Sequence, residues 1–209
     1  MATEEELLRA WREGSAEAAD ALVRCSYWSV YRFFEQQLEL QAEDLTQRTF
    51  MLAAEQLDSV QGSFRAYLFG IARRQLADAL RRRYAEGDRM RRIGTPAAAE
   101  HQTRLSALAA RRQEQVLLLR ALATLASDSQ MIVALYYWEG MNAAQIAEVF
   151  ELSHSAMRSR LSKVREDLRA ALESVAASPE LRRAVAADLD GWARSVASAV
   201  APGEPKLPW

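Results

Sequence analysis

The residues best suited to chemistry in this sequence are the basic and polar side chains of 153–165. A short apolar segment at 143–150 precedes them, and a tight turn at Glu151-Leu152 joins the two. A short helix, a tight turn and a longer basic helix are typical of a helix-turn-helix, whose second helix lies in the major groove of DNA. Arginine can bind guanine through two hydrogen bonds, methionine offers only apolar contact, and the later basic residues suit phosphates. The residues expected to contact DNA here are Ser153, His154, Ser155, Met157, Arg158, Ser159, Arg160, Lys163 and Arg165.

A second group suited to DNA contact lies within 58–84. There the aromatic residues Phe64, Tyr67 and Phe69 stand beside a run of arginines. Aromatic faces can stack on unpaired bases while arginines hold the backbone, which is what binding of single-stranded DNA requires. The alternative interpretation is that Phe64 and Phe69 are core residues, as aromatic residues at helical spacing more often are. Two such elements joined by a linker would contact two separated sites on one DNA.

The total charge argues against nucleic-acid binding, because 27 basic residues stand against 28 acidic ones among 209 and the net charge is −1. Along the chain, however, the charges separate. Residues 1–60 carry a net of −7, residues 61–92 carry +6, and 152–172 hold five basic residues against two acidic ones. This asymmetry indicates two faces with different partners. For any one of these runs, the alternative is a solvated helix face.

Catalytic and metal-binding patterns are scarce. The single cysteine, Cys25, cannot form an internal disulfide, and neither His101 nor His154 has a partner at metal-ligand spacing. The sequence has no phosphate-binding loop, dinucleotide fingerprint or nucleophile elbow. We therefore expect neither an enzyme nor a bound metal or cofactor. The N-terminus lacks the regions of a signal peptide and the apolar run 131–138 is too short for a bilayer, so a soluble cytoplasmic protein is expected.

Helices must position these residues, because apolar residues recur at helical spacing and no Asn-Gly or Asp-Gly hairpin turn occurs. Capping residues mark several boundaries, with Ser63, Asn142 and Ser153 at helix starts and Gly140 at a helix end. The predicted fold class is all-α: two helical domains joined by a linker, followed by a C-terminal helical tail. The expected helices cover 4–12, 16–38, 43–57, 64–84, 112–125, 127–139, 143–150 and 154–172, with a tail helix after Ser178-Pro179.

Four ordered segments carry a family resemblance. Residues 42–50 resemble the segment with which extracytoplasmic-function sigma factors grip the clamp helices of bacterial RNA polymerase. Residues 62–74, with the arginines at 81–83, resemble the segment that opens and reads the −10 promoter element. Residues 139–147 and 153–165 resemble the region that reads the −35 element. The similarity spans about residues 5–84 and 112–172, and the ordered combination is far more specific than any one motif.

The resemblance implies an activity and a division of the chain. It implies an N-terminal domain over 1–85, a linker over 86–111, a C-terminal helix-turn-helix domain over 112–173 and an extension over 174–209 outside the common family pattern. Such a protein binds core RNA polymerase, recognises the −10 and −35 elements and assists promoter melting in transcription initiation, without catalysis. An anti-sigma factor is a further expected partner.

Site residues follow from the same resemblance. Polymerase clamp helices in this family offer basic residues, for which Glu43 and Asp44 are suitable partners, so the expected polymerase-binding set is Glu43, Asp44, Gln47, Arg48 and Phe50. The expected −10 set is Ser63, Phe64, Arg65, Tyr67, Arg73, Arg74, Asp78, Arg81, Arg82 and Arg83.

Two other classes of protein remain open at this point. A stand-alone helix-turn-helix regulator would bind a duplex site tightly without polymerase and would not need the 43–74 constellation. A helical interaction protein would carry the same basic helices as solvated faces. The tail has an apolar stripe that includes Leu189 and Val196, so it must pack on its own domain or on another protein.

Overall fold

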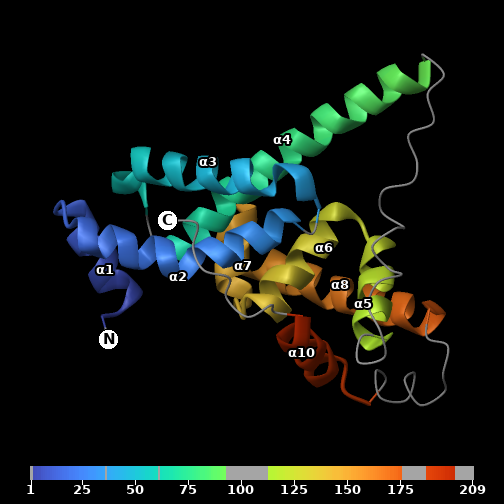
Figure 1. The fold of residues 1–209 in the computed structure, drawn as a ribbon. Coiled ribbons are helices and arrows are strands. Elements are labelled where there is room, and N and C mark those ends of the chain that lie inside the picture. Colours follow the sequence, from blue (N-terminus) through green and yellow to red (C-terminus); the bar gives the residue numbers. More distant parts are fainter. Residues whose placement is uncertain (1, 36, 61, 93–112, 176–186, 201–209) are drawn as a thin grey trace. The chain divides into compact units, whose positions relative to one another are not determined.

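The computed structural model describes residues 2–35, 37–60, 62–92, 113–175 and 187–200 (Figure 1). Every regular element among these residues is a helix, which confirms the all-α expectation. The elements are α1 (Glu4–Arg12), α2 (Ala16–Glu35), η1 (Glu39–Gln41), α3 (Ala42–Glu55), η2 (Leu57–Ser59), α4 (Phe64–Arg92), α5 (Gln113–Ala123), α6 (Ser127–Val133), η4 (Ala134–Trp138), α7 (Ala143–Phe150), α8 (His154–Val175) and α10 (Leu189–Val200).

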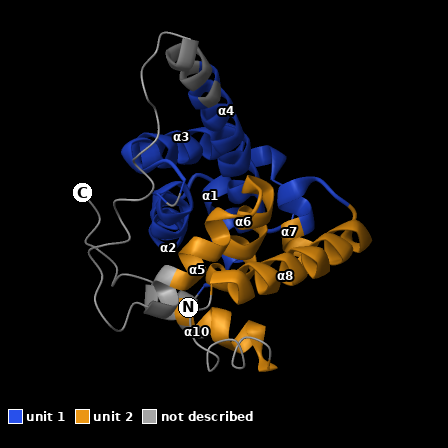
Figure 2. Cartoon of the chain, turned by 90° about the vertical axis from the view of Figure 1, so that its right-hand side faces the viewer, with its two compact units in different colours: residues 1–97, 147–152, 206–209 blue, residues 98–146, 153–205 orange. Residues whose placement is uncertain are grey.

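The described residues fall into two compact units, coloured separately in Figure 2. One contains the described residues up to Arg92 together with 147–152, and the other contains 113–146, 153–175 and 187–200. The second half of α7 and the turn after it thus group with the first unit. No described helix is long and apolar enough to cross a membrane.

The first unit is built around α2, α3 and α4, with α1 packed against α2. Its core consists of apolar side chains that recur at helical spacing, as the sequence predicts, and burial of each contributes about 1.5–3 kcal/mol relative to exposure. The fully buried members with the largest side chains are Phe34, Phe64, Leu68, Phe69 and Leu76.

Hydrogen bonds at helix ends set where the helices of this unit begin. Thr3 and Glu6 form a reciprocal capping box at the start of α1. Ser63 Oγ accepts the Ala66 N–H at 3.3 Å, so Ser63 caps α4 as expected. Arg12 donates to the carbonyl oxygens of Leu57 and Val60, which ties α1 to the turn before α4.

The second unit is a helical bundle in which α5 and α6 pack on α8, and α10 packs on η4 and α5. Its core includes Leu118, Ile132, Leu135 and Leu168, all at most 1 % exposed. These residues come from α5, α6, η4 and α8, so the core forms only when the four elements pack together.

The helix expected over 127–139 changes character halfway. It is α-helical to Val133 and then widens into the π-helical turn η4, where Glu139 N–H donates to Ala134 O, five residues back, at 3.1 Å. Gly140 ends it with φ +64°, and Met141 N–H reaches back to Leu135 O at 2.9 Å. The C-cap role expected for Gly140 is confirmed, since this conformation favours glycine.

Two other boundaries differ from expectation. Helix α4 continues to Arg92, so residues 86–92 of the expected linker are helical. Gly87 weakens a helix by about 1 kcal/mol relative to alanine but does not end it. The tail helix α10 begins at Leu189, and its expected cap at Ser178-Pro179 lies outside the described residues.

Candidate nucleic-acid interface

Local hydrogen bonds cap both ends of α7, the short first helix of the helix-turn-helix. Asn142 Oδ1 accepts the N–H groups of Ala144 and Gln145 at 2.9 and 3.0 Å, and Gln145 returns a bond to Asn142 N–H. At the other end, Glu151 adopts φ +55°, which non-glycine residues rarely do. Leu152 N–H then donates to Ala147 O at 2.9 Å, which reverses the chain into α8.

The first two turns of α8 present most of the residues expected to contact base edges. Ser153 caps the helix by accepting the Ala156 N–H at 3.2 Å. The side chains beyond it are exposed, and they lie at the N-terminal end of the helix, where the positive end of its dipole also lies. The exposed members of the expected set are Ser153, His154, Ser155, Arg158 and Ser159.

Met157 is the exception, and its assignment to DNA contact is corrected. Its side chain is 0 % exposed and belongs to the core side of α8 with Leu161, Val164 and Leu168. These four residues recur at steps of four and three, the spacing of a buried helical stripe. An apolar side chain near the start of a recognition helix can face either the thymine methyl group or the core. Here the side chain of Met157 packs into the core of its own domain.

The three cations expected to bind phosphates all form ion pairs within the unit. Arg160 pairs with Asp128 at 2.7 Å and Lys163 with Asp167 at 3.0 Å. Arg165 donates to both carboxylate oxygens of Asp190. The pair of Lys163 spans four residues of α8 and is the most exposed at its cation, with 68 % of that side chain accessible, so it contributes little to stability and is readily exchanged for a phosphate.

The start of α4 combines a buried aromatic ring with a carboxylate from α1. Phe64 is 0 % exposed and contacts Trp11 edge to face, with ring centroids 5.6 Å apart. It therefore cannot stack on a base without leaving the core, and its assignment to the −10 set is corrected. Ser63 Oγ donates to the Glu4 carboxylate at 2.9 Å, so an anion already lies at the N-terminus of α4, where the helix dipole favours it.

Tyr67 and the arginines further along α4 remain at the surface to different degrees. Tyr67 is half-buried, and its hydroxyl donates to Gln56 O at 3.3 Å. Arg65 and Arg73 are half-buried as well. The exposed members of the expected −10 set are Arg74, Asp78, Arg81, Arg82 and Arg83. Within this group Asp78 forms an ion pair with Arg81, one helical turn away.

Helix α3 divides into a buried and an exposed face. On the buried face Thr46 and Thr49 are 0 % exposed, and each hydroxyl donates to a carbonyl of α3 itself at 2.7 Å. Phe50 is half-buried and stacked on Tyr27, with ring centroids 6.0 Å apart. Its ring therefore packs mainly within the unit, and only part of it is accessible to a partner. The exposed members of the expected polymerase-binding set are Glu43, Asp44, Gln47 and Arg48.

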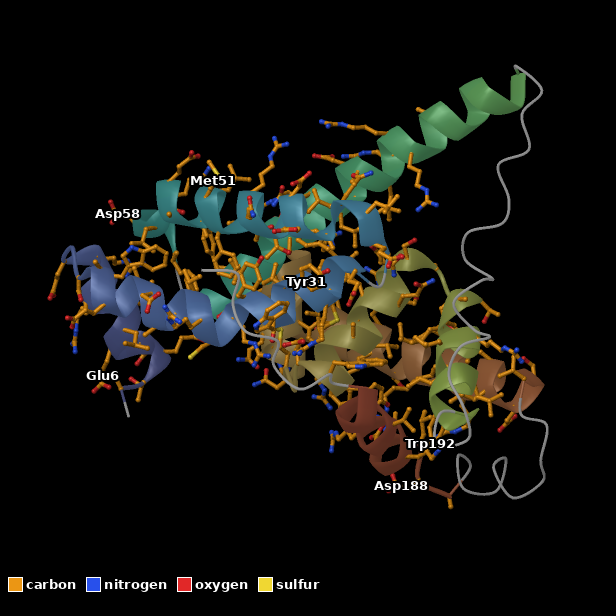
Figure 3. The ribbon with its side chains drawn as sticks, in the orientation of Figure 1. Glu6, Tyr31, Met51, Asp58, Asp188 and Trp192 are labelled. Carbon is orange, nitrogen blue, oxygen red and sulfur yellow. The ribbon has the colours of Figure 1, made fainter. Side chains whose placement is uncertain are left out.

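Two exposed apolar residues beside this set were missed from the sequence. Leu40 is 90 % exposed and Met51 is 64 % exposed. Met51 is labelled on α3 in Figure 3. Met51 falls on the same side of α3 as Asp44 and Arg48, because residues three and seven apart share a helix face. Leu40 lies in η1, directly before α3. A large apolar residue outside the buried stripe of a helix is a sequence pattern that predicts an exposed contact surface.

These features define a helical protein with a helix-turn-helix and a long basic helix. Two family models match it, one in each half of the chain. "Sigma-70 region 2" matches residues 24–86, and "Sigma-70, region 4" matches residues 115–168. The first match covers α3 and most of α4, and the second covers α5 to most of α8.

Similar proteins agree with these matches. A probable RNA polymerase sigma factor, RfaY, of Xanthomonas campestris pv. campestris is 30% identical over 132 residues, which are 61% of this chain and 33% of that protein. This chain thus matches about a third of that relative's length. CnrH in complex with the cytosolic domain of CnrY superposes with a TM-score of 0.60 at 23% identity, covering 82% of this chain and 97% of that one.

A second solved structure gives the same fold. The sigma factor RpoE in complex with the anti-sigma factor NepR from Bartonella quintana superposes with a TM-score of 0.57 at 22% identity, covering 74% of this chain and 96% of that one. The chain therefore belongs to the sigma-70 family of RNA polymerase sigma factors, whose regions 2 and 4 match it in that order.

Proposed function

We propose that this protein binds core RNA polymerase, recognises the −10 and −35 elements of a promoter and assists promoter melting at the start of transcription. The observation that carries the proposal is the order of regions 2 and 4 on one chain, at 24–86 and 115–168. It works by binding and makes or breaks no covalent bond. We place this activity in the cytoplasm, where RNA polymerase acts on DNA.

Recognition of the −35 element is assigned to the start of α8. His154, Ser155, Arg158 and Ser159 are exposed together there, and the N-terminal residues of a recognition helix contact base edges in the major groove. Arg158 can bind a guanine through two hydrogen bonds, a contact that contributes about 1–3 kcal/mol of discrimination.

Action at the −10 element is assigned to α4. The exposed arginines at 81–83 follow the half-buried Tyr67 by about four helical turns. Flipping a base out of the duplex costs a few kcal/mol, and stacking on an aromatic side chain or arginine offsets about 1–3 kcal/mol of that cost. With Phe64 in the core, Tyr67 is the aromatic residue of the expected set that is accessible for this role. The arginines hold phosphates, so binding weakens steeply with salt.

The exposed face of α3 is the proposed polymerase contact. It presents the carboxylates of Glu43 and Asp44 together with Met51, and Leu40 of η1 is exposed just before it. A protein interface of this kind combines apolar anchors with a charged rim. We retain the division into domains at 1–85 and 112–173, a linker at 86–111 whose residues 86–92 continue α4, and an extension at 174–209. An anti-sigma protein is a further proposed partner, because the similar RpoE structure is a complex with one.

Runoff transcription with purified core polymerase on a promoter library tests the proposal. Wild-type protein should direct transcription from a subset of the library. An Arg81/Arg82/Arg83→Ala variant should lose promoter opening and keep core binding, while an Arg9/Arg24→Ala variant, which removes exposed arginines from α1 and α2, should behave as wild type. Absence of transcription with any promoter would overturn the proposed function, and normal opening by the triple variant would overturn the role of α4.

The same purified protein separates the two alternative classes. A stand-alone regulator would bind a duplex site tightly without core polymerase. A helical interaction protein would bind DNA neither alone nor with core polymerase. Arg158→Ala provides the finer test, since a base contact should change the preferred −35 sequence, whereas a phosphate contact would weaken binding to all sequences alike.

A further inference from the structure

The tail helix α10 lies beyond the region 4 match, which ends at residue 168, yet it is part of the second unit. Leu189, Ala193 and Val196 are at most 3 % exposed, and α10 contacts η4 and α5. Asp188 begins the helix by accepting the Gly191 N–H at 2.9 Å (Figure 3). The tail is therefore docked by an apolar stripe, as its sequence pattern requires of a helix that packs.

Asp190, in the first turn of α10, forms an ion pair and a hydrogen bond in this docking, beside a contact of Arg194 with Tyr136 of η4. Its carboxylate accepts two hydrogen bonds from the Arg165 guanidinium and one from the Tyr137 hydroxyl at 2.5 Å. The Arg165 and Asp190 side chains are 38 % and 27 % exposed. Burial disfavours the charged guanidinium, but Asp190 and Tyr137 outweigh it and raise the pKa of Arg165. The arginine is therefore held as a cation against one specific carboxylate.

The position of Arg165 on α8 gives this contact a consequence for DNA. Arg165 follows Arg158 by seven residues, which places it on the same side of the helix, rotated by about 20° and about 10 Å further along the axis. A cation at that distance from a base-reading residue is suited to the phosphate backbone beside it. The fork of an arginine binds a carboxylate and a phosphate with the same two-bond geometry.

We propose that α10 is an autoinhibitory latch: Asp190 takes the place of a DNA phosphate on Arg165 and withholds this cation from DNA until α10 is released. The inference rests on the proposed binding of DNA by α8. It assigns a role to the extension, which the family match does not cover. Release of α10 adds one phosphate contact to the DNA-binding face and thereby raises affinity for any duplex sequence.

The test is the salt dependence of DNA binding by the full-length chain. The probe is a labelled duplex of random sequence, about two helical turns long, titrated between about 50 and 200 mM salt. Asp190→Asn keeps an acceptor for Tyr137 but removes the charge that holds Arg165. It should bind several-fold more tightly at low salt, and its plot of log affinity against log salt should be steeper by about 0.9.

Three further variants separate a latch from a simple change of charge. Glu173→Gln removes the same charge from an exposed position on α8 and should leave the slope unchanged. Arg165→Ala and Arg165→Ala/Asp190→Asn should bind alike, because the released cation is absent from both. Leu189→Ala weakens the docking of α10 without altering any charge and should shift binding in the same direction as Asp190→Asn, with circular dichroism confirming that each variant is folded.

The inference is wrong if folded Asp190→Asn and Leu189→Ala bind the duplex with the wild-type slope and affinity, or if neither variant nor wild type binds it. It is also wrong if Asp190→Asn binds more tightly whether or not Arg165 is present. The proposed function is judged separately by runoff transcription, which can succeed with the latch disproved. If the protein fails in runoff transcription but the Asp190→Asn variant still has a steeper salt dependence, the latch is supported and the proposed sigma-factor function is not.

Discussion

Arg160 of α8 donates a hydrogen bond of 2.7 Å to Asp128, which lies in the first turn of α6. The carboxylate is favourably placed, because the N-terminus of a helix carries the positive end of its dipole. The two side chains are 37 % and 42 % exposed. An arginine that the sequence alone assigns to a phosphate therefore joins the recognition helix to the helix that packs beside it.

This contact should contribute measurably to stability. We expect Arg160→Ala and Asp128→Ala each to lower the free energy of unfolding by about 0.5–1 kcal/mol, since half-exposed ion pairs contribute in this range. A double-mutant cycle in urea should give a positive coupling energy between them. The Lys163–Asp167 pair is the matched comparison, and because its cation is more exposed its coupling should be smaller. If the effect of the double variant equals the sum of the two single effects, the coupling energy is zero and the pair has no structural role.

Met157 should behave as a core residue and not as a DNA contact. Met157→Ala removes a side chain that is 0 % exposed, and such truncations cost about 2–5 kcal/mol. Thermal unfolding should show a large loss, whereas Ser155→Ala on the exposed face should change stability by about 0.5 kcal/mol or less. A stable Met157→Ala variant with altered −35 preference would contradict the burial and restore the original assignment.

Tyr137 should ionise at a higher pH than an ordinary tyrosine. Burial, and then the hydrogen bond to Asp190, raise the pKa of Tyr137 above its usual value of about 10. A group whose pKa is raised on folding stabilises the fold fully below its unfolded pKa, and this contribution is lost as pH rises beyond that value. The Tyr137–Asp190 contact should thus be intact at neutral pH and loosen only in alkali.

Alkaline titration followed by tyrosinate absorbance checks this expectation. Tyr137→Phe should remove the last transition, and Asp190→Asn should move that transition to lower pH, because one cause of the shift is reduced. A last transition unchanged by both substitutions would mean that the phenol is not held as the structure shows it.

The exposed apolar residues Leu40 of η1 and Met51 of α3 should matter to polymerase binding and not to folding. Leu40→Ser/Met51→Ser removes side chains that are 90 % and 64 % exposed, so the free energy of unfolding should stay within about 0.5 kcal/mol of wild type. If both residues lie at the centre of the interface, affinity for core polymerase should fall by about 2 kcal/mol or more. Leu152→Ser, at an exposed position in the turn before α8, is the matched control and should retain core affinity.

Patterns within single helices were predictable because they depend on local chemistry. Helical spacing placed α1, α3, α7 and α8 within two residues of their observed starts, and Ser63 and Gly140 mark a real helix start and end. Local rules also have limits. Helix α4 continues through Gly87 into the expected linker, because one glycine does not end a helix, and the π-helical turn at 134–138 has no signature in residue type.

The sequence by itself determined the fold class, the order of regions 2 and 4, and the segregation of charge, because periodicity, capping and charge are properties of neighbouring residues. Only the tertiary structure decided which members of each set face outward. Phe64 and Met157 are in the core, and Arg160 and Arg165 are held by carboxylates from helices distant in the chain. Burial and ion pairing depend on what packs against a residue, and Asp190 lies 25 positions away from the arginine it binds.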